Sequence, residues 1–246
     1  MNTPASPLSA APSGTAVKAV LFDLDDTLWA IEPVLVRAES LLYEWLRTHA
    51  PRVTAAHTVV SLRERRMALM QTDPRYRIDL WKLRHAALTE VFAEYGEDLA
   101  LVDEAMALFS EARSTVALFD DVEPALLRLK EKLTLGSVSN GFADLERIGL
   151  AEHFGVSLAA HRFGRAKPDA AIFHAACEAL GVAPAAAVYV GDDPHLDVQG
   201  AQQAGLRAVW MNRFDRPLPE GIVPDAVCRD LHELHDWLEA QAAPAA

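Results

Sequence analysis

Short apolar runs that alternate with helical patterns constrain the fold of this 246-residue sequence more than any other feature. The runs are rich in β-branched and apolar residues and too short for helices of ordinary length, which is typical of buried strands. They occupy residues 16–24, 133–139, 156–159, 187–191 and 208–211. Strands that alternate with helices form βαβ units, so we expect an α/β fold in which a parallel sheet carries helices on both faces.

Proline and glycine mark the ends of the intervening helices. Pro168 begins one helical pattern, and Gly181 lies where a left-handed residue commonly ends a helix. Another pattern begins at Pro124, and a third extends over residues 194–204 and stops at Gly205. Each pattern lies between two predicted strands, as the crossover helices of a parallel sheet do.

Residues 30–113 interrupt the alternation, because they show helical periodicity without a convincing strand. The apolar residues at helical spacing are Leu35, Ala38, Leu42 and Trp45 after Pro33, and Leu80, Leu83, Ala87 and Val91 before Gly96. An insertion after the first strand would lie over the carboxyl ends of the strands, where open sheets bind ligands. We therefore expect an α/β core of residues 18–29 and 114–246 and an inserted all-α part of residues 30–113.

The first seventeen residues contain no charged side chain and mix Pro, Ser, Ala and Gly. They have neither the basic start nor the continuous apolar stretch of a secretory signal, so we expect a disordered leader at residues 1–17. The longest uncharged stretch of note, residues 179–191, is shorter than the roughly 20 residues that a membrane span requires. We expect a cytoplasmic protein without a membrane partner.

The charge balance narrows the set of binding partners. The sequence carries 35 acidic residues against 23 Lys and Arg, which gives a formal net charge of −12. Nonspecific binding to nucleic acid or to anionic membranes depends on clustered basic residues, so this balance argues against both. Only Cys177 and Cys228 are present, which excludes a disulfide framework and disfavours a metal site built from thiolates.

Acidic residues follow the first predicted strand. Asp23, Asp25 and Asp26 lie within four residues of one another and precede Thr27. Unpaired buried charges are costly, which leaves three explanations: a helix cap, a cation site or a reaction centre. A helix cap accounts for one Asp near a helix start, but not for two at an i, i+2 spacing at the end of a buried strand.

A second acidic group follows the predicted strand at 187–191 and consists of Asp192, Asp193 and Asp197. When two parallel strands of one sheet end in carboxylates, those ends can converge at the same edge, and the repulsion between them demands a divalent cation. Hard oxygen ligands favour Mg²⁺ over zinc. The two acidic groups therefore predict Mg²⁺ as the cofactor.

Two further polar signals lie near predicted strand ends. Ser139 and Asn140 offer a hydroxyl and an amide to a bound anion. Lys167 places a cation at the start of a helix whose N-terminus already favours negative charge. Alone, these would be a turn serine and a solvated surface lysine, but their order along the chain makes the combination more specific.

Taken in order, these motifs resemble those of the haloacid dehalogenase superfamily of hydrolases. FDLDDT matches its first motif, VSN its second, KP its third and GDDPHLD its fourth, and the resemblance covers about residues 18–237. It implies a Rossmann-like parallel sheet core. It also implies that the insertion at residues 30–113 is the α-helical cap found at this position in one subgroup.

The resemblance further implies an enzyme, and in particular a phosphatase. Phosphatase members carry a second Asp two residues after the nucleophile, which haloacid dehalogenases lack, and this chain has it at Asp25. Asp23 would attack phosphorus and form an aspartyl-phosphate, while Asp25 would protonate the leaving oxygen and then take a proton from water. A 2-haloacid dehalogenase is disfavoured by Asp25. A noncatalytic binding module is disfavoured because each motif residue is present.

By the same resemblance, Mg²⁺ would be held by the Asp23 carboxylate, the Asp25 backbone carbonyl and the Asp192 carboxylate. The residues implied to bind the phosphate group are Thr27, Ser139, Asn140 and Lys167. Behind these ligands, Asp197 is expected to orient Lys167 or a water molecule on the metal. Asp193 remains open between a supporting role and that of a plain loop residue.

A finer resemblance concerns the substrate. The segments FDLDDTLWAIEPVLVRAE, DLWKLRHAAL, SNGFADLERIGLAEHF and VGDDPHLDVQGA are similar to bacterial phosphatases that act on flavin mononucleotide (FMN) and on the phosphorylated ribitylaminouracil intermediate of riboflavin synthesis. The motifs also fit pyrimidine nucleotidases and sugar phosphatases such as those of acylneuraminates. The expected partner is a small phosphorylated metabolite, and the expected assembly is a monomer or a homodimer.

Three residues near or within the insertion are candidates for substrate specificity. Trp29 directly follows the first motif and is placed to stack on a planar or sugar-bearing leaving group. Arg75 and Tyr76 belong to a cluster of basic and aromatic residues in the segment DPRYRIDLWKLR. The alternative is that the aromatic residues of the cluster pack in the insertion and its arginines face solvent.

Overall fold

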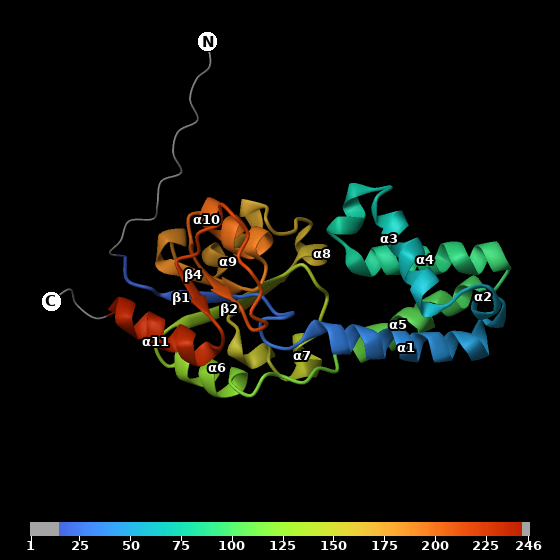
Figure 1. Ribbon diagram of the computed structural model, residues 1–246, viewed down its shortest axis with the longest axis horizontal. Coiled ribbons are helices and arrows are strands. Elements are labelled where there is room, and N and C mark those ends of the chain that lie inside the picture. The colour runs from blue at the N-terminus through green and yellow to red at the C-terminus, as the bar shows by residue number, and fades with distance from the viewer. Residues whose placement is uncertain (1–14, 243–246) are drawn as a thin grey trace, which may run out of the picture.

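The computed structural model describes residues 15–242, so residues 1–14 of the predicted leader lie outside the described part of the chain. Within this part, six parallel strands form one sheet in the order β3-β2-β1-β4-β5-β6. The strands are β1 (Ala19–Phe22), β2 (Thr134–Ser139), β3 (Val156–Ala159), β4 (Ala187–Gly191), β5 (Arg207–Met211) and β6 (Ala226–Cys228). Helices cover both faces of the sheet (Figure 1), which confirms the predicted α/β fold with a Rossmann-like parallel sheet.

The first strand, β1, lies in the middle of the sheet and aligns the strands that carry the sequence motifs. Phe22 at its end lies opposite Ser137 of β2 on one side and Val190 of β4 on the other. The strand is shorter than the predicted 16–24 and ends before Asp23, whose N–H still donates to the Val190 carbonyl at 2.8 Å. The carboxyl ends of β1, β2 and β4 are therefore neighbours.

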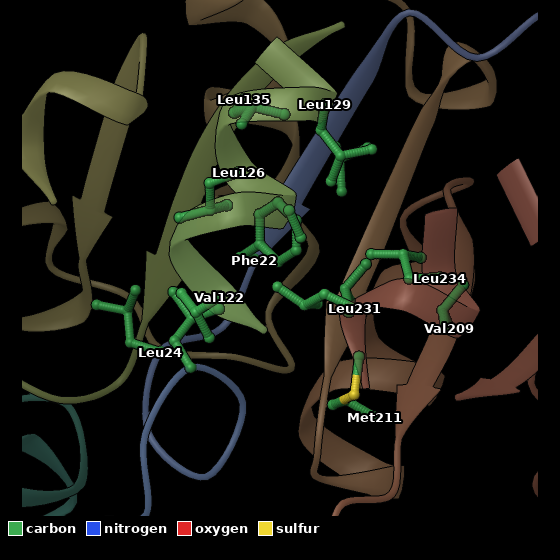
Figure 2. Close-up of a cluster of buried hydrophobic side chains, with 14 of the residues drawn as sticks. Phe22, Leu24, Val122, Leu126, Leu129, Leu135, Val209, Met211, Leu231 and Leu234 are labelled. Carbon is green, nitrogen blue, oxygen red and sulfur yellow. The ribbon is translucent and has the colours of Figure 1, made fainter. Parts of the chain in front are cut away.

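Side chains of β1 alternate between two hydrophobic cores, as strand geometry requires. Helices on each face of the sheet complete these cores. One face is covered by α6 (Val122–Lys130) and α11 (Leu231–Ala242), and the other by α9 (Ala170–Ala179) and α10 (Gly200–Gln203). Phe22 packs with Leu126 of α6 and Leu231 of α11 in the first core (Figure 2). Leu21 packs with Phe173 of α9 in the second. Full burial of each such side chain stabilises the fold by about 1.5–3 kcal/mol.

Five α-helices lie between β1 and α6 and extend to one side of the sheet (Figure 1). They are α1 (Ile31–His49), α2 (Pro51–Ala56), α3 (Val59–Met70), α4 (Leu80–Tyr95) and α5 (Val102–Arg113). These helices share a hydrophobic core of their own, to which Leu46, Phe92 and Phe109 contribute fully buried side chains. We refer to residues 30–113 as the cap.

Local sequence signals set the ends of the cap helices. The Asp79 carboxylate accepts a hydrogen bond from the Lys82 backbone N–H at 2.8 Å and so caps the start of α4. The same helix ends at Gly96, whose φ of 67° is the left-handed conformation that favours glycine. Thr58 and Ser61 form a reciprocal capping box at the start of α3.

The two segments that connect the cap to the sheet are bonded to each other. The chain enters the cap at Trp29, which forms an antiparallel bridge with Leu118 on the returning segment. The Phe119 N–H donates to the Leu28 carbonyl at 3.1 Å. The two ends of the insertion therefore lie side by side, next to the carboxyl end of β1.

Several short elements complete the fold and were not predicted individually. They are α7 (Leu145–Ile148), α8 (Ala160–Phe163), the 3-10 helices η1 (Pro74–Arg77), η2 (Leu99–Leu101), η3 (Ala151–His153) and η4 (Pro184–Ala186), and the π-helical turn η5 (Pro194–Gln199). The predicted helix at 194–204 is thus η5 followed by α10. Across residues 15–242, we find no helix with the length and apolar character that crossing a bilayer requires.

Candidate active site

Three carboxylates converge where β1 and β4 end. Asp23 directly follows β1, Asp192 directly follows β4, and Asp197 lies in η5. One carboxylate oxygen from each of the three lies within 4.8 Å of the others. The parallel register of β1 and β4 thus brings together two acidic groups that are far apart in the sequence. Their hard oxygen donors are the kind that a divalent cation such as Mg²⁺ prefers.

Lys167 is buried against this cluster. Its Nζ donates to Asp23 Oδ1 and Asp197 Oδ1, each at 2.6 Å, and to the Tyr189 hydroxyl at 2.8 Å. The Tyr189 hydroxyl in turn donates to the Val138 carbonyl at 2.8 Å. Three partners, the Asp23 carboxylate after β1, the Tyr189 hydroxyl on β4 and the Asp197 carboxylate in η5, therefore hold one ammonium group in place.

The charges of the cluster do not balance without a further cation. Burial, opposed by Lys167 and reinforced by Asp197 and Asp192, holds the pKa of Asp23 well above its ordinary value. Burial and the charges of Asp197 and Asp26 raise the pKa of Asp192 to about 7. Burial disfavours the Lys167 ammonium, but Asp197 and Asp23 outweigh that effect and raise the pKa of Lys167. Two cations, Lys167 and Arg216, face the four carboxylates of Asp23, Asp192, Asp197 and Asp26, which leaves a net negative site that fits a divalent cation.

Asp25 points to a different set of partners from Asp23. The Trp29 Nε1–H donates to Asp25 Oδ1 at 2.9 Å, and Arg113 Nη2 donates to the same oxygen at 2.6 Å and also to Oδ2. Trp29 is fully buried, so its ring is held beside Asp25. The place of Trp29 after the first motif predicts stacking on a leaving group; in the structure its ring is fully buried and its Nε1–H is bonded to Asp25.

Asp25 meets the end of β2 at Gly141. A Cβ atom at Gly141 would lie 2.8 Å from Asp25 Oδ2 and 3.2 Å from both Arg113 Nη2 and Ser139 Oγ. The buried Ser139 Oγ accepts a hydrogen bond from the Gly141 N–H at 2.9 Å. Only glycine leaves room for this approach, which places Ser139 and Asp25 around one backbone position.

The remaining residues expected to bind phosphate differ in what their side chains contact. The Thr27 hydroxyl is buried and has no hydrogen-bond partner within the described residues. Asn140, in contrast, uses both amide atoms on the backbone of Lys167: Oδ1 accepts from its N–H at 2.8 Å, and Nδ2 donates to its carbonyl at 3.1 Å. Asn140 therefore joins the end of β2 to the segment that carries Lys167.

Asp193 and Asp197 have distinct contacts. Asp193 accepts hydrogen bonds from the backbone N–H groups of His195 and Leu196 at 2.8 and 2.9 Å, and so caps η5. Asp197 holds Lys167 through Oδ1 and accepts from the Asp193 N–H through Oδ2 at 2.9 Å. Asp197 thus contacts Lys167 directly, and Asp193 has the contacts of a loop-capping residue.

Arg75 and Tyr76 lie in η1 of the cap, and no described hydrogen bond joins either of them to the residues at the strand ends. Arg75 is exposed and pairs with Asp73 at 2.6 Å. Both residues line a surface cavity of about 410 Å³ with Lys82 and His85. The structure thus does not bring the two cap candidates into contact with Asp23 or Asp25.

Two arginines at the site were not identified from the sequence. Arg113 ends α5 and contacts Asp25, as described above. Arg216, in the loop after β5, donates to Asp192 Oδ2 at 3.0 Å and to Asp26 Oδ2 at 3.1 Å. Arg113 and Asp25 are 88 residues apart in the sequence, and Arg216 and Asp26 are 190 residues apart. No local sequence pattern predicts contacts over such separations.

An acidic centre with a buried lysine, at the strand ends of a parallel sheet and beside helices inserted after the first strand, is typical of hydrolases built around an aspartate. The chain belongs to the haloacid dehalogenase-like hydrolase family, whose family model matches residues 17–205. This membership confirms the resemblance that the four sequence motifs indicated.

Known relatives carry phosphatase names. The 5-amino-6-(5-phospho-D-ribitylamino)uracil phosphatase YigB of Escherichia coli is 30% identical over 199 residues, which cover 79% of this chain and 83% of that protein. The phosphoserine phosphatase of Thermus thermophilus is 32% identical over 248 residues, with 89% and 98% covered. Among solved structures, a protein described as the 2-haloacid dehalogenase of Pseudomonas syringae superimposes with a TM-score of 0.86 at 38% identity, with 92% of this chain and 100% of that chain covered.

Proposed function

We propose that this hydrolase is a Mg²⁺-dependent phosphatase that cleaves phosphomonoesters of small metabolites through an aspartyl-phosphate. The observation that carries the proposal is the pair Asp23 and Asp25. Asp23 belongs to the carboxylate cluster that fits a cation, while Asp25 is not among its three carboxylates and has its Oδ2 close to Gly141. Two carboxylates two residues apart are thus available for two different tasks. The phosphatase names of the relatives from E. coli and T. thermophilus support this assignment.

The reaction would proceed in two displacements. In the first, a carboxylate oxygen of Asp23 forms a bond to phosphorus, the bond to the leaving oxygen breaks, and Asp25 gives that oxygen a proton. In the second, water attacks the phosphorus of the aspartyl-phosphate and gives a proton to Asp25. The bond to Asp23 then breaks, which releases inorganic phosphate and restores both carboxyl groups to their starting states.

Other residues of the chain would hold the substrate's phosphoryl group and the metal. Asp23 and Asp192 with their carboxylates and Asp25 with its backbone carbonyl would hold Mg²⁺, which when bound neutralises charge on the phosphoryl oxygens. The further groups available to phosphoryl oxygens are the Lys167 ammonium and the hydroxyls of Ser139 and Thr27. Asn140 and Asp197 would act by holding Lys167 in position.

For the substrate, we propose FMN or a ribityl phosphate of riboflavin metabolism. The similarity of four motif segments to phosphatases of that group supports this choice, as does the ribityl phosphate named for the E. coli relative. Pyrimidine nucleotides and sugar phosphates are the alternative substrates. We further propose that the enzyme acts in the cytoplasm as a monomer or a homodimer.

A phosphate-release assay with purified protein and a panel of phosphorylated metabolites tests both levels of the proposal. We expect Mg²⁺-dependent hydrolysis of p-nitrophenyl phosphate, loss of that activity in Asp23→Asn, and a higher kcat/KM for FMN or a ribityl phosphate than for simple sugar phosphates. Full activity of Asp23→Asn would refute the nucleophile. FMN hydrolysis no faster than that of sugar phosphates would refute the substrate while leaving the phosphatase class intact.

The P. syringae structure makes a 2-haloacid dehalogenase the second candidate function. Such an enzyme attacks carbon and needs no group to protonate its halide, so it has no use for a carboxylate at Asp25. The hydrogen bonds that Trp29 and Arg113 donate to Asp25 therefore favour the phosphatase. Chloride release from 2-chloropropionate in the absence of Mg²⁺ would reverse this judgement.

A further inference from the structure

Arg113 occupies an unusual position for a charged residue. It is the last residue of α5, where the chain leaves the cap, and its side chain is only 4% exposed. Arginine is seldom buried unless it is paired. Here the carboxylate that pairs with it is that of Asp25, which accepts from Nη2 with both of its oxygens.

A second donor reaches the same carboxylate from the other connection between cap and sheet. The Trp29 Nε1–H donates to Asp25 Oδ1 at 2.9 Å, and Trp29 is fully buried. Trp29 lies on the segment that enters the cap, and Arg113 lies on the segment that leaves it. Both connections therefore contribute a rigid, planar donor group to Asp25.

The loop after β2 also approaches Asp25 and Arg113. Asp25 Oδ2 and Arg113 Nη2 approach the Cα of Gly141 so closely that a Cβ would lie 2.8 and 3.2 Å from them. The Ser139 hydroxyl lies at the same 3.2 Å from that Cβ position. Asp25 thus has neighbours at the end of β2 and on both connections to the cap, while 23% of its side chain stays exposed.

Stability of the fold does not account for this placement. Arg113 Nη1 is buried without a hydrogen-bond partner within the described residues, and an unsatisfied buried donor destabilises a fold. An arginine whose task was only to join the cap to the core would gain from a position where both terminal nitrogens are paired. What this position achieves is a fixed orientation of one carboxylate.

We propose that Arg113 is a positioning residue for the proton transfers of Asp25, an inference that rests on the proposed phosphatase function. A lone aspartate can rotate about two side-chain torsions. Donors from Arg113 and Trp29 hold both carboxylate oxygens, so the oxygen that exchanges protons with the leaving group and with water stays in one place. A proton transfer requires such placement to be efficient.

The test measures kcat/KM for a series of aryl and alkyl phosphates whose leaving groups differ in pKa. This ratio reports steps up to release of the leaving group. A poor alkoxide leaving group needs the proton from Asp25, whereas p-nitrophenolate departs with little help. We expect Arg113→Met to lose about 100-fold in kcat/KM on alkyl phosphates, within the range of acid–base contributions, and far less on p-nitrophenyl phosphate.

Two further variants make the result specific. Arg113→Lys keeps the charge and should recover part of the selective loss. Arg65→Ala, which removes a cap arginine from its exposed pair with Glu94, should leave the dependence on leaving group as it is in the parent enzyme. Because the comparison is between two substrates of one preparation, the fraction of folded enzyme cancels.

An equal loss on every substrate in Arg113→Met would overturn the positioning role, since it would show that Arg113 acts on the fold or on substrate binding alone. An unchanged enzyme would overturn it as well. If the parent protein hydrolyses no phosphomonoester of the series, the failure lies with the proposed function rather than with Arg113, so the two failures are distinguishable.

Discussion

The buried Nζ atom of Lys167 lies 2.6 Å from Oδ1 of Asp197, and this pair connects the segment before α9 to η5, the turn that follows β4. The Asp197 side chain is 1% exposed. Its second oxygen accepts a hydrogen bond from the Asp193 backbone N–H, so both carboxylate oxygens have hydrogen-bond partners. The same ammonium also holds Asp23, which makes the pair a support for the proposed nucleophile.

Asp197→Asn should destabilise the protein and reduce hydrolysis together. Asn keeps the shape of the side chain but removes the charge, and loss of one partner from a buried ion pair costs about 3–5 kcal/mol. Urea denaturation measures the change in free energy of unfolding. Glu239→Gln removes the carboxylate of an exposed pair with Lys132 and should leave the transition midpoint nearly unchanged. Equal midpoints for the two variants would contradict the structural role of Asp197.

Mg²⁺ should stabilise the folded protein, because ligands that bind only the folded state shift its equilibrium by mass action. At 100 times its dissociation constant, the ion should add about 2.7 kcal/mol, read as a rise in Tm that EDTA reverses. Asp192→Asn should abolish this rise. Asp193→Asn alters the adjacent carboxylate, which caps η5, and should retain it. A Tm that ignores Mg²⁺ in the parent protein would argue against a cation in the carboxylate cluster.

Gly141→Ala should impair catalysis more than stability. The added Cβ would push Asp25, Arg113 and Ser139 apart, and misplacement of reacting groups by about 1 Å can cost about 100-fold in rate. Gly155→Ala is the matched control. Its added Cβ would lie 3.1 Å from a methyl carbon of Leu180 and would contact none of the motif residues. We expect similar losses of Tm in the two variants and a loss of kcat/KM only in the first. Parallel losses of activity would refute the role of the Gly141 approach.

Glu39→Gln should destabilise the cap. The buried Glu39 carboxylate accepts hydrogen bonds from Arg63, Arg66 and Arg84, so its neutralisation would leave the buried Arg84 without its carboxylate partner, at a cost of about 3–5 kcal/mol. Denaturation followed by tryptophan fluorescence measures this change.

The effect of Glu39 should depend on pH with a defined sign. Burial raises the pKa of Glu39, but the three arginines outweigh it and lower the pKa below its ordinary value. The stabilisation is therefore present above the pKa of an unfolded Glu, about 4.3, and is lost as the pH falls through the lower folded value. The difference between parent and Glu39→Gln should be constant near neutrality and shrink in acid. A difference that grows toward low pH would contradict this account.

The sheet was largely predictable because its strands are short apolar runs. β4, at Ala187–Gly191, matches its predicted range, and β2 and β5 differ by one residue at their starts. β6, at Ala226–Cys228, was missed because three residues of mixed exposure carry no periodic signal. Its place depends on pairing with β5, a contact that no local pattern specifies.

The candidate site was predictable where it follows strand ends and unpredictable where long-range contacts decide. Asp23 and Asp192 could be expected to meet once β1 and β4 were read as parallel neighbours. The end of a helix is an ordinary place for an arginine, so nothing marked Arg113 as a partner of Asp25. Trp29 and Asn140 were identified as site residues, but the groups that they contact depend on packing.

The hydrogen bond between the Phe119 N–H and the Leu28 carbonyl has a consequence for how proteins of this design diversify. Since the two segments that flank the inserted helices are already bonded to each other, the helices between them can lengthen, shorten or be replaced without moving a strand. If the cap selects the substrate, as its candidate residues were predicted to do, the substrate could then change through the cap alone while the residues at the strand ends are kept.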